Sequence, residues 1–277
     1  HNRPNYLNYL YKFMKNKKYI LYFHNDPLTM VGSKNVTERK FLLKICYRIL
    51  FNSNWSKKRF LEGLENKFIN SDKLQVVFQS ANKSKIDLNI KEKMITFVGK
   101  LNRAKGYDIF GKAVIKILNK YKKWTANVIG DEQRDKINFT HSRLINHGFL
   151  KHDKVIDIYK KTNIAVVCSR WEEPFGRTSL EASSNGCAVI ISNKGGLPET
   201  ITNGVILKQL SVKDLYTSID KLIKKNVDRK NLQKLSLKNF FLTHSYVSKL
   251  IDKFRDEKFG NLSLFNTNKT KKNLRTM

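Results

Sequence analysis

The segment from residue 164 to residue 185 reads as a buried strand, a turn and a helix, and it constrains the fold of this chain more than any other. Ile164-Ala-Val-Val-Cys168 is a short apolar run typical of a buried strand. The stretch Glu173-Pro-Phe-Gly-Arg-Thr-Ser-Leu-Glu181 follows, with a carboxylate at each end and a helical pattern after the glycine. A helix that opens at Gly176 offers free backbone N–H groups and the positive end of its dipole, which favour a phosphate. The two carboxylates can accept hydrogen bonds from hydroxyl groups beside that phosphate.

Two further segments place glycines after a strand. The first is Ile95-Thr-Phe-Val-Gly-Lys-Leu-Asn-Arg-Ala-Lys-Gly106, and the second is Gly195-Gly196-Leu-Pro-Glu199 after the apolar run 187–191. Along the chain, strand patterns alternate with helical periods, which predicts βαβ units and parallel sheets. Ligands of such sheets bind at the carboxyl ends of the strands, so basic residues in the first turn are placed to reach a phosphate group.

The three segments, in this order, resemble the motifs of the retaining GT-B glycosyltransferases of family 4, also called glycosyl transferases group 1. The resemblance implies an α/β fold of the GT-B type, with two Rossmann-like doubly wound domains that face a cleft. Only about 85 residues precede the linker, and the glycine-rich loop that the family has near its N-terminus is not seen. We therefore expect an incomplete first domain, and with it a truncated chain whose own activity is an open question.

The pattern divides the chain into four parts. The resemblance implies that they are a partial acceptor-side domain (1–85), a nucleotide-sugar-binding domain (86–230), C-terminal helices that pack back toward the first domain (231–258) and a basic tail (259–277). Within these parts, the hydrophobic period predicts a helix over 37–50 and a strand over 49–53, and the pattern is helical again over 231–255.

The resemblance also implies roles for individual residues. His24, Glu173 and Lys105 are the implied catalytic residues. Glu181 would accept hydrogen bonds from the ribose, and Glu173 from the donor sugar. The implied donor-binding residues are Gly99, Lys100, Arg103, Lys105, Gly148, Phe149, Glu173, Phe175, Gly176, Arg177, Thr178 and Glu181. Neither a metal ion nor a cofactor is implied, and the nucleotide diphosphate sugar is a co-substrate.

Each of these roles has a plainer alternative. Lys100 and Lys105 can be solvated loop lysines in a Lys-rich chain, and Gly148-Phe149 can be a hydrophobic turn. His24 can be structural, and Glu181 can simply favour the first turn of its helix through the dipole. Gly195, Gly196 and Glu199 are expected to shape the wall of the cleft.

The implied function is transfer of a hexose, with retention and without a metal, from a nucleotide diphosphate sugar to a hydroxyl of a glycan or lipid-linked glycan. Two alternatives stay open. One is a noncatalytic fragment that binds sugar nucleotides. The other is a basic protein that binds nucleic acid or an anionic membrane, and it predicts binding that collapses with salt.

The formal net charge of +31 is the second unusual feature of the chain. Lys greatly outnumbers Arg, and Asn and Ile are abundant, which indicates a compositional bias spread over all surfaces. Nucleic acid is the less favoured partner because no RNA-binding motif interleaves aromatic residues with Arg. An anionic membrane surface remains an option. No apolar run approaches the ~20 residues that span a bilayer and no signal peptide is visible, so we expect a cytoplasmic protein, with the inner face of the membrane as a second location.

Overall fold

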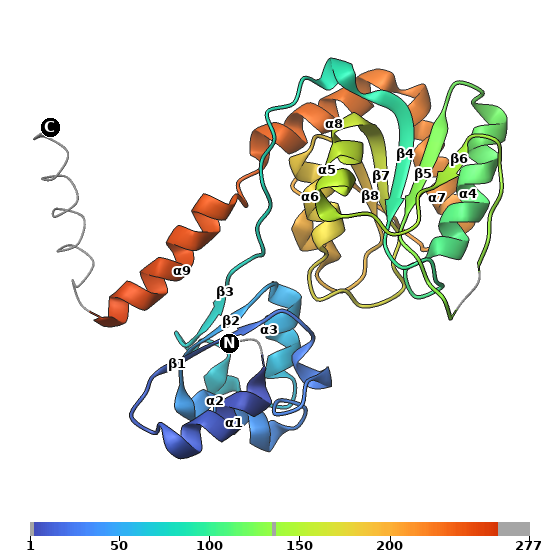
Figure 1. Cartoon of the computed structure of the whole chain (residues 1–277). Coiled ribbons are helices and arrows are strands. Elements are labelled where there is room, and N and C mark those ends of the chain that lie inside the picture. The colour runs from blue at the N-terminus through green and yellow to red at the C-terminus, as the bar shows by residue number, and fades with distance from the viewer. Residues whose placement is uncertain (1–2, 135–136, 260–277) are drawn as a thin grey trace, which may run out of the picture.

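The computed structural model describes residues 3–134 and 137–259, with side chains described up to residue 255. The chain forms two α/β units, each built on its own parallel sheet (Figure 1). The first unit and the linker comprise α1 (Pro4–Phe13), β1 (Tyr19–Phe23), η1 (Pro27–Thr29), α2 (Val36–Ile45), β2 (Cys46–Phe51), α3 (Asn54–Leu61), η2 (Asn66–Phe68), β3 (Leu74–Val76) and η3 (Leu88–Ile90). The second unit and the C-terminal helices comprise β4 (Glu92–Val98), α4 (Tyr107–Lys120), β5 (Thr125–Ile129), β6 (Leu144–Asn146), α5 (His152–Lys161), β7 (Thr162–Val167), α6 (Arg177–Ser184), β8 (Ala188–Ile191), η4 (Leu197–Thr200), β9 (Val205–Ile206), α7 (Val212–Lys224), α8 (Asn226–Asn239) and α9 (His244–Phe259).

The second sheet has the order β6-β5-β4-β7-β8-β9 and is covered on both faces. Successive side chains of a strand point to opposite faces, so Ile164 and Val166 of β7 pack toward α4 and α7. Ala165 and Val167 pack toward α5 and α6 on the other face. Figure 1 shows the sheet between these two pairs of helices. Burial on both faces explains why β7 reads as a continuous apolar run.

The first sheet has the order β1-β2-β3, and all its strands are parallel. Its core packs Leu7 of α1 and Leu42 of α2 against the strands. Phe23, Phe51 and Phe60 form a cluster in which the rings of the first two stack with centroids 5.5 Å apart. These two Rossmann-like units are the α/β architecture that the sequence predicts.

Two sequence predictions of local structure were wrong. The helix predicted over 37–50 ends at Ile45, and the strand predicted over 49–53 begins at Cys46. A short apolar run fits both periods, and here its aromatic and branched residues pair with β1. The helical pattern over 231–255 forms two helices, α8 and α9, which are separated at 240–243. The helix α1 was not predicted, and of the tail expected over 259–277, residues 260–277 lie outside the described residues.

The chain passes between the two units twice, and the two connecting segments lie side by side. The linker after β3 passes α6 on its way to β4, and the segment between α8 and α9 returns beside it. Ala81 N donates to Leu242 O at 3.0 Å, and Ser80 Oγ lies 2.8 Å from His244 Nδ1. Helix α9 then packs on the first unit through Val247, which joins Leu50 and Val77 in a small apolar cluster.

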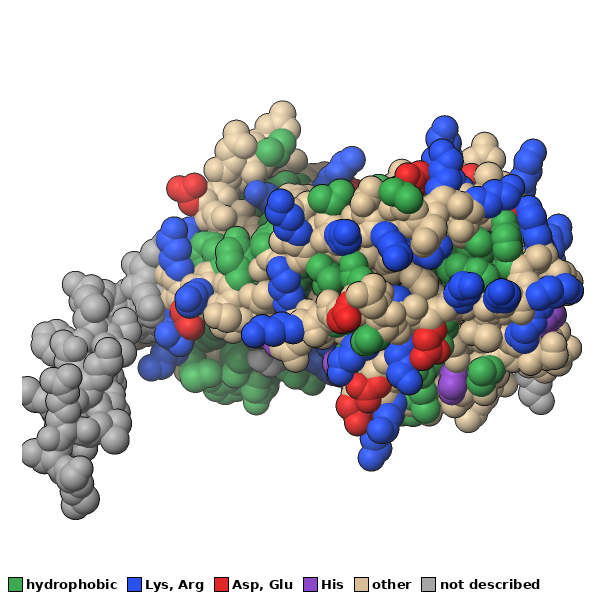
Figure 2. Space-filling model, turned by 90° about the horizontal axis from the view of Figure 1, so that it is seen from above, with side chains coloured by type: hydrophobic (Ala, Val, Ile, Leu, Met, Phe, Trp, Pro, Cys, Tyr) green, Lys and Arg blue, Asp and Glu red, His purple; other side chains and the backbone are tan. Residues whose placement is uncertain are grey.

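Basic side chains are scattered over the face of the molecule shown in Figure 2. Acidic and apolar side chains lie between them on that face, without one dominant basic patch. Among the described residues, none of the helices combines the length and the apolar character of a membrane-spanning segment. The three cysteines, Cys46, Cys168 and Cys187, are buried free thiols. Burial raises the pKa of the Cys168 thiol to about 12, so it stays protonated at neutral pH.

Candidate functional site

The candidate site lies at the carboxyl edge of the second sheet, between the loops that follow β4 and β7. These strands are neighbours in the sheet, but the chain leaves β4 toward β5 and β6 and later returns to β7 on the other side. The two loops therefore diverge and leave a crevice, which is where open parallel sheets bind their ligands.

The loop after β4 is held close to the loop after β7 by a glycine. Gly106 has a φ of 74°, and a Cβ added to it would lie 1.9 Å from Cys168 O. Within the loop, the backbone N–H of Lys105 donates to Asn102 Oδ1 at 3.0 Å. A residue with a side chain at position 106 would force the loops apart, so the glycine positions Lys105 at the crevice.

Lys105 and Glu173 meet in the crevice. Lys105 Nζ donates to Glu173 Oε1 in a short ion pair. The Gly195-Gly196 turn packs against the backbone of Glu173. A Cβ on Gly195 would lie 2.2 Å from Glu173 O, and Gly196 N donates a hydrogen bond to the same oxygen at 2.6 Å. The three motifs seen in the sequence thus converge on Glu173.

A cavity of about 200 Å³ opens beside this ion pair. Helix α6 begins at its wall, with Gly176 at the N-cap position and no side-chain cap on the first N–H groups. Its lining residues are Phe97, Val98, Gly99, Lys105, Val167, Ser169, Glu173, Gly176, Arg177 and Thr178. Two cations and a helix N-terminus thus face one carboxylate, an arrangement that suits an anionic ligand that also carries hydroxyl groups.

Glu181, the second carboxylate of the motif, lies in the second turn of α6 and is only 6% exposed. Its Oε1 accepts a hydrogen bond from Arg177 Nη2 at 2.9 Å and pairs with His152 Nε2 at 3.0 Å. These residues line a smaller cavity of about 60 Å³. The sequence analysis missed His152, because a single histidine at the start of a helix carries no pattern that would connect it to Glu181.

His24 follows β1 and faces the second unit. Gln79 Nε2 lies 2.8 Å from His24 Nδ1, and Asn52 Nδ2 donates to His24 O at 3.0 Å. Burial lowers the pKa of His24, and the positive charge of Arg177 lowers it further. That electrostatic effect crosses from the second unit to the first, although His24 does not line the 200 Å³ cavity.

The two units are joined beside the site by the start of α3. Ser53 Oγ donates to Pro174 O at 2.5 Å. The carboxylate of Glu199 accepts hydrogen bonds from Asn54 N and Asn54 Nδ2, both at 2.7 Å, and from Trp55 N at 2.9 Å. The sequence predicts that Glu199 shapes the cleft wall. In the structure, its carboxylate accepts hydrogen bonds from the first N–H groups of α3 in the first unit.

The other implied donor-binding residues lie apart from the cavity. Lys100 and Arg103 are exposed and do not line it. Gly148 adopts a φ of 63° in the turn after β6, and the Phe149 side chain is 76% exposed.

Phe175 does not line the cavity. It is buried and stacks on Phe78 of the linker, with ring centroids 5.8 Å apart.

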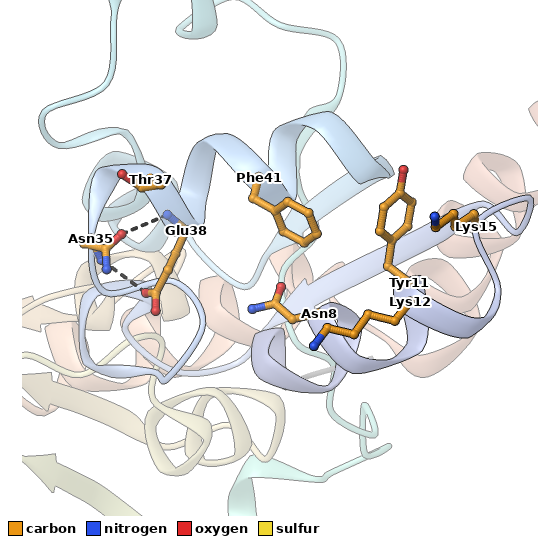
Figure 3. Close-up of a pocket in the computed structure, with 8 residues that line it drawn as sticks. All are labelled: Asn8, Tyr11, Lys12, Lys15, Asn35, Thr37, Glu38 and Phe41. Atoms are coloured by element: carbon orange, nitrogen blue, oxygen red, sulfur yellow. Dashed lines mark hydrogen bonds between the residues drawn. The ribbon is translucent and has the colours of Figure 1, made fainter.

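A larger cavity of about 650 Å³ lies elsewhere, between α1 and α2. Figure 3 shows Tyr11 and Phe41 pointing into it, with Glu38 and Asn35 hydrogen-bonded to each other at one end. That pair is the capping box of α2, so its polar groups serve the helix. None of the residues predicted from the sequence motifs lines this cavity.

Comparison with known proteins finds relatives of this chain and of its fold. An uncharacterized glycosyltransferase of Methanocaldococcus jannaschii is 28% identical over 177 residues, which cover 55% of this chain and 45% of that protein. The chain thus spans less than half the length of that relative. Among solved structures, a glycosyltransferase of Rickettsia africae aligns with a TM-score of 0.73 and 21% identity, covering 93% of this chain and 75% of that one. HepE of Anabaena in complex with UDP-glucose aligns with a TM-score of 0.71 and 15% identity, covering 91% of this chain and 76% of that one.

These alignments confirm the GT-B fold expected from the sequence. The profile of the family described as glycosyl transferases group 1 matches residues 78–238, which span the linker, the sheet of the second unit and α8. That match includes all three motifs, and the chain belongs to the glycosyl transferases group 1 family.

Proposed function

We propose that the crevice is the donor site of a glycosyltransferase, which moves a sugar from a nucleotide diphosphate sugar to a hydroxyl of an acceptor. The observation that carries this proposal is the ion pair of Lys105 and Glu173 at the 200 Å³ cavity where α6 begins. A cation and a helix N-terminus suit the diphosphate, and a carboxylate suits the hydroxyls of the sugar. Family membership and the UDP-glucose bound to HepE support the same ligand class.

The ion pair also suggests how the ligand would be received. Lys105 is one-third exposed and Glu173 less so, and each is the other's partner in the absence of a ligand. The charge of a diphosphate would draw Lys105 toward its oxygens. Glu173 would then be released to accept hydrogen bonds from the donor sugar, so its carboxylate changes partners without ever being left unpaired.

The proposed reaction keeps the configuration of the sugar and needs no metal ion. The bond between the anomeric carbon and the diphosphate oxygen breaks, the acceptor oxygen bonds to that carbon from the same face, and the acceptor proton passes to the departing phosphate. Lys105, Arg177 and the start of α6 would stabilise the charge of the leaving group electrostatically. A covalent intermediate on Glu173 is the less favoured route.

His24 is the residue of the first unit that we propose to take part in the reaction. Its lowered pKa keeps the imidazole neutral at physiological pH, so it can exchange hydrogen bonds with a hydroxyl without adding charge. We propose a glycan or lipid-linked glycan as the acceptor. We also propose a cytoplasmic location at the inner face of the membrane, where the net charge of +31 favours anionic headgroups.

Isothermal titration with UDP, GDP and ADP tests the proposal. At moderate and at high salt, we expect saturable binding of one nucleotide, because a built site is less screened than surface charge. Lys105→Ala should weaken it by about tenfold or more, the value of one hydrogen bond to a charged group. Lys116→Ala removes the same charge from an exposed position on α4 and should leave the affinity unchanged.

Two results would contradict the proposal. The first is weak binding of all three nucleotides that disappears at high salt, which would indicate attraction by charge alone. The second is an equal loss of affinity in Lys105→Ala and Lys116→Ala. Turnover of the matching nucleotide sugar, measured as nucleotide release with and without a soluble sugar acceptor, separates an enzyme from a protein that only binds.

A further inference from the structure

His152 holds one oxygen of a carboxylate that the protein interior would otherwise leave poorly paired. Glu181 is nearly buried, and both of its described side-chain partners reach the same oxygen, Oε1. Arg177 reaches it from one turn earlier in α6, and His152 from the first residue of α5. A buried carboxylate needs hydrogen-bond partners, and these two contacts fix its orientation.

The second oxygen of Glu181 is left available. No residue in the described part of the chain donates a hydrogen bond to Oε2, and Glu181 lines the 60 Å³ cavity. A carboxylate oxygen has two acceptor positions, so Oε2 can still take hydrogen bonds from a ligand. With Oε1 held by two donors, the carboxylate presents one oxygen to its neighbours and the other to the ligand.

The small cavity adjoins the donor cavity at a single side chain. Arg177 lines both, with Glu173 and Lys105 in the larger cavity and Glu181 in the smaller one. A nucleotide diphosphate sugar whose diphosphate lies beside Lys105 would extend past Arg177 and bring its ribose to Glu181. This step rests on the proposed function of the crevice.

We propose that His152 is a positioning residue for the ribose of the donor. Its Nε2–H holds Glu181 Oε1, so that Oε2 is aimed at the ribose hydroxyls. The role requires a proton on Nε2, which both the imidazolium and one neutral tautomer provide. This role does not require contact between His152 and the nucleotide. It predicts that replacing His152 affects the binding only of nucleotides that have the ribose 2′-hydroxyl.

Comparing a nucleotide with its 2′-deoxy counterpart tests this role. Whichever of UDP, GDP and ADP binds the wild-type chain is titrated beside its 2′-deoxy form, into the wild type, His152→Ala, His152→Gln and His141→Ala. In the wild type, we expect the hydroxyl to improve affinity by about tenfold, the value of one hydrogen bond to a charged group. His152→Ala should bring that preference to about twofold or less while the affinity for the 2′-deoxy nucleotide stays the same. His152→Gln, whose amide can donate as Nε2–H does, should restore most of the preference.

His141 is the matched control, because its Nε2 lies 3.2 Å from Asn119 Oδ1, away from Glu181. His141→Ala should keep the full preference for the hydroxyl. Equal weakening of both nucleotides in His152→Ala would indicate a general loss of structure and overturn the inference. An unchanged preference would overturn it as well, while the proposed function would stand as long as Lys105→Ala weakens binding. Absence of saturable nucleotide binding to the wild type would overturn both.

Discussion

Removing the carboxylate of Glu199 should weaken the contact between the two units. Its described partners are the backbone N–H groups of Asn54 and Trp55 and the Asn54 side chain, all in the first unit. The first N–H groups of a helix have no intrahelical acceptor; in α3 the Ser53 side chain accepts from Ser56 N, and Glu199 accepts from the two N–H groups before it. Since Glu199 comes from the second unit, its contribution to stability measures the contact between units.

The size of the effect follows from the geometry. Hydrogen bonds to a charged acceptor contribute about 1.5–3 kcal/mol, and a carboxylate at a helix N-terminus adds about 0.3–1 kcal/mol. The contact is partly exposed, so water replaces some of what is lost. We therefore expect Glu199→Ala to cost about 2 kcal/mol. Glu199→Gln keeps an acceptor oxygen and loses the charge, and should cost about half as much.

Thermal unfolding measures this difference. For chains of this size 1 kcal/mol corresponds to about 2–4 °C, so Glu199→Ala should lower the Tm of the transition that reports the first unit by roughly 4–8 °C. Glu172→Ala is the control, because the Glu172 carboxylate bonds Lys194 and Gly195 within its own unit. Small-angle scattering should show a larger radius of gyration for Glu199→Ala alone. If Glu199→Ala melts and scatters like the wild type, the units are not held together by this contact in solution.

Three further changes have defined expected outcomes. Gly106→Ala should destabilise the second unit by about 2 kcal/mol or more and abolish nucleotide binding, since its Cβ would overlap Cys168 O at a backbone φ of 74°; urea unfolding and titration measure both effects. Lys91→Met should cost about 1–3 kcal/mol in urea unfolding, because the half-buried ammonium donates to the carbonyls of Tyr159 and Asn185, and Asn185 O has no other donor in the described part of the chain. His24→Gln should reduce the loss of stability that the wild type shows below about pH 6.5. Burial lowers the pKa of His24, so as the pH falls the imidazole is protonated first in the unfolded chain, which favours unfolding. The variant has no imidazole at this position and keeps that stability. Unfolding free energies of both proteins between pH 5 and 8 would show parallel curves if His24 does not titrate this way.

Local patterns in the sequence were sufficient to predict the core of the site. The strand before Glu173 is buried on both faces, and Gly176 opens the helix after it, as the sequence predicts. These features depend on residues close together in the chain. The boundary between α2 and β2 was placed wrongly, because the run around Cys46 fits either period and only pairing with β1 decides it.

Contacts between distant residues were beyond the reach of sequence patterns. Glu199 and Asn54 are 145 positions apart, and no local pattern joins a Gly-Gly turn to the start of a particular helix. His152 and Glu181 are 29 positions apart on two different helices. The break between α8 and α9 has the same origin, because Leu242 leaves the helical path to pair with the linker at Ala81.

The segment from Glu173 to Glu181 has two roles, and its residues divide between them. Glu173 lines the larger cavity, the Pro174 carbonyl receives Ser53 of the first unit, and the Phe175 side chain is buried against the linker. Gly176 then opens the helix that carries Glu181. The two carboxylates that line the cavities, Glu173 and Glu181, are thus separated in the chain by Pro174, which contacts the first unit, and Phe175, which contacts the linker. A change at these contacts should therefore alter nucleotide binding if the proposed donor site is correct.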